Sequence, residues 1–197
     1  MKLAFILLIS IVGPFPLIME KIPKPFCYHV LSAIFVIVSI VAGYQIIKGN
    51  WKLKDIGITK DYINRRSLLW YGSALVLSII VFFSLYRTEQ VNDITIKTIV
   101  LSFLVSAAQV VLYQGYLMKV GHEIFREKLW PVNVLMNVIL YTYMHAFYSL
   151  SNLEYVLIVA AGIMFATLYR YFPNIFLVII LHFITNLQAI YLGMFQS

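Results

Sequence analysis

The stretch FPNIFLVIILHFITNLQAIYL, residues 172–192, decides the fold class. It is long and apolar enough to span a bilayer, which takes about 20 residues as a helix. Its central polar residues, His182 and Asn186, lie one helical turn apart, with Thr185 and Gln188 close by. Polar side chains inside a membrane helix are costly to bury in lipid, so they face another helix or a wet cavity. We therefore expect a membrane helix whose polar face carries function.

The rest of the chain repeats this apolar character. Of its 197 residues, 62% are apolar or aromatic and 12% are charged, and the mean hydropathy is +0.89. A soluble domain carries about twice that charged fraction, so a soluble globular protein is excluded. We expect an all-α, polytopic membrane helix bundle that forms a single membrane domain over residues 1–197. Its seven predicted spans lie near 3–19, 28–47, 68–86, 96–118, 131–150, 154–170 and 174–195.

The first of these spans has two interpretations. Lys2 followed by LAFILLISIV resembles the core of a signal peptide, while Gly13, Pro14 and Pro16 interrupt the run. No small-x-small cleavage site follows, which favours a retained, proline-kinked helix over a cleaved signal sequence.

The charged residues predict an orientation. With seven spans, 11 of the 15 Lys and Arg residues fall on the side of the N-terminus and 4 on the other. The positive-inside rule then places the N-terminus in the cytoplasm and the C-terminus outside, in what we expect to be a bacterial plasma membrane. Six of the positive charges lie between residues 48 and 66, in a loop expected to lie on the membrane surface and to fix orientation. No nucleic-acid motif is present.

Polar residues recur at helical spacing in three spans. Ser102, Ser106, Gln109 and Tyr113 share one face of the fourth span, and Asn133, Asn137, Tyr141 and His145 form a stripe on the fifth. We predict that these spans and the seventh turn their stripes toward a common cavity, lined in part by Ser106, Tyr113, Asn137 and Tyr141. For each Ser, Asn or Tyr taken alone, interhelical hydrogen bonding is the competing interpretation. The spans 28–47 and 154–170 are almost wholly apolar and are expected to face lipid.

The chemistry open to such a site is limited. Zinc needs several His, Cys or carboxylate ligands, and His145 and His182 alone do not supply them. Cys27 is the single cysteine, and Glu154 is the single acidic residue within the predicted span limits. A serine nucleophile would need a histidine beside it that a third group holds in place, and nothing in the sequence identifies Ser102 or Ser106 as such a serine. We expect no metal and no cofactor.

Two intramembrane motifs carry a family resemblance. HFITN, residues 182–186, and YTYMH, residues 141–145, resemble the His-x-x-x-Asn and Phe-x-x-x-His motifs of the CAAX-protease and bacteriocin-processing membrane proteins, also called the Abi family. LYRYFPNIFLVII, residues 168–180, resembles the family's loop into its C-terminal helix. The resemblance covers roughly residues 50–195 and implies His145, His182 and Asn186 as catalytic residues that position water and stabilise an oxyanion.

The family's first motif, Glu-Glu-x-x-x-Arg followed by Gly, is where this chain departs. Aligning QGYL, residues 114–117, with Arg-Gly-Tyr-Leu places Gln114 at the arginine and Gln109 and Val110 at the glutamates. The resemblance would make the first glutamate the general base, and Gln109 cannot accept a proton. Glu123, in the echo HEIFR, is fourteen residues along and in a charged loop, so we discount it.

Three functions remain at this point. The leading one is a protein with a degenerate catalytic site that binds a peptide or another membrane protein, as in bacteriocin immunity or regulation. The joint loss of two glutamates and their arginine favours it, because it leaves no unpaired charge in the membrane. The second is an active intramembrane endopeptidase that uses His145, His182 and Asn186. The third, a small transporter or channel, lacks repeat symmetry and intramembrane acids.

Overall fold

The computed structural model is all-helical in the residues that it describes, which are 37, 40, 43, 44, 47 and 48 and the ranges 51–85, 93–125, 127–145 and 150–194. No strand occurs in these residues, and the all-α prediction is confirmed. The longer helices are α4 (Arg65–Leu85), α5 (Ile96–Val110), α6 (Met118–Phe125), α7 (Trp130–Tyr143), α8 (Asn152–Tyr171) and α9 (Ile175–Tyr191). The short elements are the 3-10 helices η1 (Leu53–Ile56) and η3 (Glu127–Leu129) and the π-helix η2 (Val111–Leu117).

Five of the seven predicted spans have counterparts in the described residues. The elements α5, η2 and α6 form one continuous helix, Ile96–Phe125, which extends the predicted span 96–118 by two turns. Arg65–Leu85, Ile96–Phe125 and Asn152–Tyr171 are long and apolar enough to cross a membrane, and Ile175–Tyr191 is a shorter apolar helix. The predicted span 3–19, and nearly all of 28–47, lie outside the described residues.

The predicted span 131–150 requires a correction. Helix α7 ends at Tyr143, so its 14 residues reach about 21 Å, short of a bilayer core of about 30 Å. Its last turn tightens, because the backbone N–H of His145 donates to the carbonyl of Thr142 at 2.9 Å. His145 therefore lies in a turn beyond the helix and not on its lateral face.

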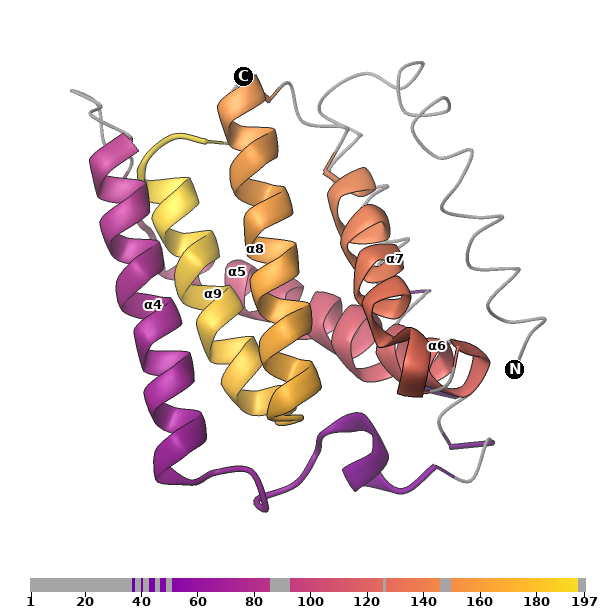
Figure 1. Ribbon diagram of the computed structural model, residues 1–197. Coiled ribbons are helices and arrows are strands. Elements are labelled where there is room, and N and C mark those ends of the chain that lie inside the picture. The colour runs from indigo at the N-terminus through magenta and orange to yellow at the C-terminus, as the bar shows by residue number, and fades with distance from the viewer. Residues whose placement is uncertain are drawn as a thin grey trace.

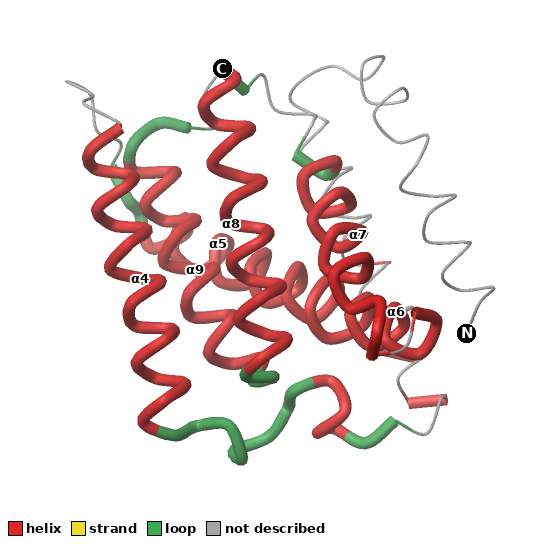
Figure 2. The backbone as a smooth tube through the Cα atoms, in the orientation of Figure 1, coloured by secondary structure: helices red, strands yellow, loops and turns green. Residues whose placement is uncertain are grey.

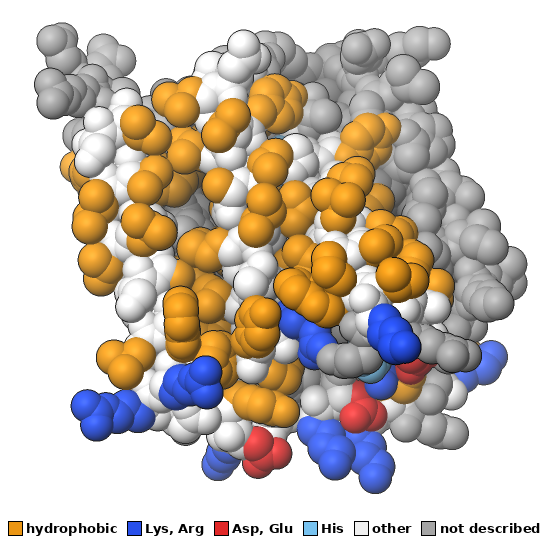
Figure 3. All heavy atoms as spheres, in the orientation of Figure 1, with side chains coloured by type: hydrophobic (Ala, Val, Ile, Leu, Met, Phe, Trp, Pro, Cys, Tyr) orange, Lys and Arg blue, Asp and Glu red, His pale blue; other side chains and the backbone are white. Residues whose placement is uncertain are grey.

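Helix α9 is central to the bundle. It packs against α5, α4 and α8, while α7 packs against α8 and α6. In Figure 1, α4, α9, α8 and α7 stand side by side, and the helix from α5 to α6 crosses behind them at a steep tilt. Large apolar side chains cover the outer surface of these helices, as expected for contact with lipid (Figure 3).

The loop before α4 is attached to the bundle and does not merely lie on the membrane. The side-chain amide of Asn174 donates to the carbonyl of Thr59 at 2.9 Å, and the backbone N–H of Ile175 donates to the carbonyl of Gly57 at 3.0 Å. Gly57 ends η1 with φ +77°, and a Cβ at this position would lie 2.7 Å from the ring of Tyr169. Figure 2 shows this loop running across the end of the bundle where α8 ends and α9 begins. Lys and Arg side chains gather at the same end (Figure 3).

Candidate active site

Side-chain hydrogen bonds join the three helices that carry the polar stripes. The amide of Asn186 on α9 donates to the hydroxyl of Ser106 on α5 at 3.0 Å. The hydroxyl of Tyr141 on α7 lies 3.2 Å from Nε2 of His182 on α9. The amide of Asn137 on α7 donates to the carbonyl of Tyr113 in η2 at 2.6 Å. The stripes of α5, α7 and α9 thus face one another.

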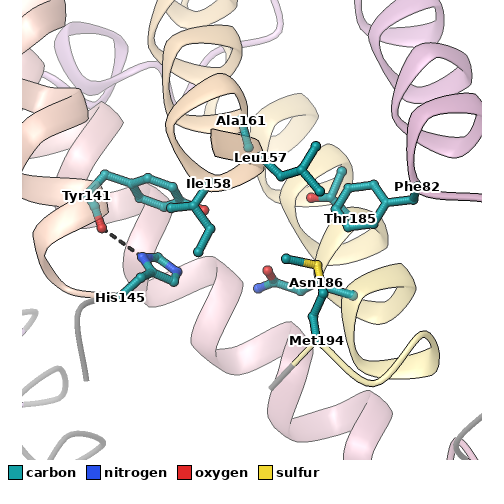
Figure 4. A pocket seen from close by; sticks show the side chains of 10 residues that line it. Phe82, Tyr141, His145, Leu157, Ile158, Ala161, Thr185, Asn186 and Met194 are labelled. Atoms are coloured by element: carbon teal, nitrogen blue, oxygen red, sulfur yellow. Dashed lines mark hydrogen bonds between the residues drawn. The ribbon is translucent and has the colours of Figure 1, made fainter. Parts of the chain in front are cut away.

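A cavity of about 270 Å³ lies between α5, α9 and the turn after α7. Its polar lining residues are Thr98 near the start of α5 and four others, Ser102, Gln109, His145 and Asn186, which we call the cavity wall. A second space of about 20 Å³, large enough for one water molecule, shares His145 and Asn186 with it. In Figure 4 these two side chains point toward one another across that space. The cavity wall therefore brings together the predicted residues Gln109, His145 and Asn186.

His145 is held in one orientation by its neighbour on α7. Its Nδ1 lies 2.7 Å from the backbone carbonyl of Tyr141, and a carbonyl oxygen only accepts, so Nδ1 donates (Figure 4). In the neutral ring the lone pair is then on Nε2. A histidine fixed in this way on a cavity wall can accept a proton from water.

Two acceptor atoms of the cavity wall are buried without a hydrogen-bond partner. These are Oε1 of Gln109 and Oγ of Ser102, and both residues are about 6% exposed. A buried carbonyl oxygen without a partner costs about 1–3 kcal/mol, so a ligand that donates an N–H or O–H here is favoured. The cavity wall therefore offers two oxygen atoms that can accept hydrogen bonds from a ligand.

His182 lies in a different environment. Its ring is 4.8 Å from that of Phe165 and 5.7 Å from that of Tyr141, measured between centroids, and it is 1% exposed. We call Tyr141, Phe165 and His182 the aromatic cluster. His182 lines neither cavity beside His145, although the ring of Tyr141 contacts both histidines, with its centroid 4.7 Å from that of His145 and 5.7 Å from that of His182.

Of the other predicted site residues, some line small cavities and the rest are buried between helices. Tyr141 lines the small space beside His145, and Asn137 lines a separate void of about 10 Å³. Ser106 and Tyr113 are buried between helices without lining a cavity, and Gln114 is buried within η2.

The predicted face of the fourth span divides, and the last of its four residues lies in a π-helix. A π turn contains more residues than an α turn, so it rotates the side chains that follow it. Ser102 and Gln109 precede η2 and line the cavity, whereas the hydroxyl of Tyr113, inside η2, reaches the carbonyl of Leu140 on α7 at 3.5 Å. Regular α-helical spacing contains no signal for such a shift.

Helix α8 contributes residues that sequence reasoning missed. It was expected to face lipid, yet Phe165 and Ala166 are fully buried, and Leu157 and Ile158 line the small space beside His145. One signal was available, because Gly162 lies where a Cβ would approach the ring of Tyr141 to 3.0 Å. A glycine in an apolar span indicates close helix contact.

Among the described residues, no carboxylate lines either cavity around His145. Glu154 caps the start of α8 by accepting from the N–H of Ser151 at 2.6 Å, and Glu123 pairs with Lys119 at 3.5 Å in α6. In the described ranges no three His, Cys, Asp or Glu side chains are grouped as metal ligands would be. Any chemistry here depends on histidine and amide groups.

The comparison with protein families agrees with this geometry. No curated protein and no solved structure matches the chain. The family model described as type II CAAX prenyl endopeptidase Rce1-like matches residues 91–188, which hold all of α5 to α8, most of α9, and Gln109, His145, His182 and Asn186. Through these residues the chain belongs to the Rce1-like branch of the CAAX-protease and bacteriocin-processing family of membrane proteins.

Proposed function

We propose that this chain is a non-catalytic member of its family that binds a peptide in the cavity beside His145, as an immunity or regulatory protein. One observation carries the proposal. Gln109 occupies the cavity wall at the position that the family's general-base glutamate would hold, and none of the described residues that line the cavity supplies a carboxylate to replace it. Losing a general base typically costs about 10²–10⁴-fold in rate, which is enough to abolish useful proteolysis.

The cavity wall suits a peptide backbone. The unpartnered Oε1 of Gln109 needs a donor, and an extended peptide offers backbone N–H groups. Leu101, Val105 and Ile190 supply apolar surface around the polar wall, which suits a hydrophobic side chain beside the bound N–H. A volume of about 270 Å³ accommodates a short segment and not a folded domain.

The position of the cavity suggests the side from which a peptide arrives. Thr98, near the start of α5, and Ile190, near the end of α9, line it, whereas Arg65 starts α4 and Arg170 ends α8 at the opposite end of the bundle. If the basic end is cytoplasmic by the positive-inside rule, the cavity opens toward the outside of a bacterial plasma membrane. A secreted peptide such as a bacteriocin would meet it there.

The test blocks the cavity with one substitution and uses a second, on the same helix, to control for changes at the lipid-facing surface. Bacteria that express the chain are challenged with membrane-active peptide bacteriocins, and survival is measured. Leu101→Trp places a large ring at the cavity, and Leu104→Trp is the matched control because Leu104 is exposed on the same helix and lines no cavity. We expect protection by the native chain and the control, and its loss in Leu101→Trp. Equal protection by all three chains would reject the cavity as the binding site.

An active endopeptidase is the second candidate, and the orientation of His145 favours it. With Nδ1 donating to Tyr141, Nε2 could take a proton from a water that attacks a peptide carbonyl, and the second N–H of Asn186 could stabilise the oxyanion. Purified chain and its His145→Ala and Asn186→Ala variants are incubated with a farnesylated CAAX peptide. Cleavage by the native chain alone would establish this candidate and overturn the leading proposal.

A further inference from the structure

A third cavity, of about 220 Å³, lies at the basic end of the bundle, far along the helices from the cavity wall. The residues that line it come from η1, α6, α7, α8 and the turn before α9. Those that carry the argument are Lys54, Asp55, Lys119, Trp130, Tyr169 and Arg170. Residues distant in the sequence thus meet in one hollow.

The charge of this hollow is positive. Lys54, Lys119 and Arg170 reach it from three separate elements, against the single carboxylate of Asp55. That carboxylate already accepts from the backbone N–H of Lys52 at 2.9 Å, in the capping box of η1. A further acid, Glu123, pairs with Lys119 at 3.5 Å, with the two side chains 29% and 23% exposed, and partly exposed pairs of this kind are weak.

The fold holds these cations in place. The loop that bears Lys54 is bound to the start of α9 by the contacts of Gly57 and Thr59 described above. Tyr169, which forms part of the wall, lies against Gly57 and is 6% exposed. The hollow is therefore a built feature and not a chance grouping of mobile surface lysines.

Aromatic residues show the depth at which the hollow lies. Trp130 lines it and packs against Tyr171 at 6.1 Å between ring centroids, and the ammonium of Lys119 lies 5.9 Å from the ring centre of Trp51. Trp and Tyr concentrate at the level of lipid headgroups. Arg170, in the last turn of α8, is at the same level, where lipid phosphates are found.

We propose that this hollow binds a phosphate group, that of an anionic phospholipid headgroup. Phosphate oxygens would accept from Lys54, Lys119 and the guanidinium of Arg170, which binds phosphate with two parallel N–H groups. This proposal is independent of the peptide cavity, since it concerns the opposite end of the bundle.

The experiment measures lipid retention by the full chain. Protein is reconstituted in bilayers of equal phosphatidylglycerol and phosphatidylcholine, extracted in neutral detergent, and its bound lipids are counted by native mass spectrometry. We expect phosphatidylglycerol to be enriched on the native chain. The double variant Lys119→Gln and Arg170→Gln should lower that enrichment by about twenty-five-fold, taking about fivefold for each cation lost near an anionic surface.

The matched control is the double variant Arg65→Gln and Lys128→Gln, which removes the same charge at the same end without altering the hollow. It should retain phosphatidylglycerol like the native chain. A second arm follows the melting temperature of lipid-free protein with inorganic phosphate, and a rise that is lost in the first double variant would support the site with a soluble phosphate as its ligand. No enrichment and no rise, or equal losses in both double variants, would overturn the proposal.

Discussion

The cavity wall and the aromatic cluster differ although both derive from the same polar stripes. In the cavity wall, Gln109 and Ser102 have acceptor atoms without partners, and His145 and Asn186 border open space. In the aromatic cluster, His182 is enclosed by Tyr141 and Phe165. The first region borders open space, whereas the second packs α7, α8 and α9 together, with Nδ1 of His182 also buried without a hydrogen-bond partner. Residues of one family motif set thus divide between a cavity lining and helix packing.

The largest expected effect is on the rate of peptide cleavage, when the charged residues of the family's first motif are introduced beside the cavity. The triple variant Gln109→Glu, Val110→Glu and Gln114→Arg restores the family's first motif in a site that retains His145 and Asn186. We expect cleavage of a farnesylated CAAX peptide to rise about 10²–10⁴-fold over the native chain, the contribution of a general base. The rate of peptide release by purified protein measures it.

Adding His145→Ala to that triple variant is the control, and it should remove the gain if the cavity wall is the reaction site. A native chain already as fast as the triple variant would show that Gln109 does not inactivate the site. The cavity wall would then be catalytic without a carboxylate at position 109.

The next effect concerns the aromatic cluster. Phe165→Ala removes a ring that is 1% exposed and packs on His182, so it leaves a void between α8 and α9. We expect the free energy of unfolding to fall by about 3–5 kcal/mol. Unfolding in mixed micelles measures it, with the half-exposed Phe103→Ala as the control of equal size. A loss no larger than that of the control would contradict the packing role.

Much of this arrangement could be predicted from the sequence. Spacing of four residues placed Ser106, Tyr141 and His182 on inward faces, and the structure joins them through hydrogen bonds across helices. Spacing does not tell whether an inward face meets a cavity or another side chain, because that depends on the partner helix. Phe165 was missed for this reason, since an apolar residue on an apolar helix packs equally well in lipid or in protein.

Two further features depended on irregular backbone. Tyr113 lies inside the π-helix Val111–Leu117 and contacts α7, and the early end of α7 puts His145 in a turn. In both places the regular α-helical hydrogen bonds are replaced by backbone hydrogen bonds of another spacing. The pattern of polar and apolar residues is the same whichever hydrogen bonds form, so periodicity does not reveal the change. The residues of the site were therefore visible in the sequence, but their division into two regions was not.

A smaller effect tests the close contact beneath the aromatic cluster. Gly162→Val adds a branched side chain where even a Cβ would lie 3.0 Å from the ring of Tyr141. Overpacking of this kind costs about 1–3 kcal/mol of unfolding free energy. Gly72→Val on α4 is the control, because nothing lies within 4 Å of a Cβ there. Equal unfolding free energies for the two variants would show that α7 and α8 separate without cost.

The smallest effect lies at the boundary between the two regions. Ser106→Ala removes the acceptor that holds the amide of Asn186, and one interhelical hydrogen bond in a membrane protein contributes about 0.6 kcal/mol. Unfolding in micelles should detect this small loss against the exposed Ser73→Ala, which should cause none. Because Asn186 also borders the cavity, its freed amide should weaken bacteriocin protection more than the stability change alone would. If protection is unchanged while stability falls, Asn186 belongs to the packing of α5 on α9, and the cavity wall reduces to Ser102, Gln109 and His145.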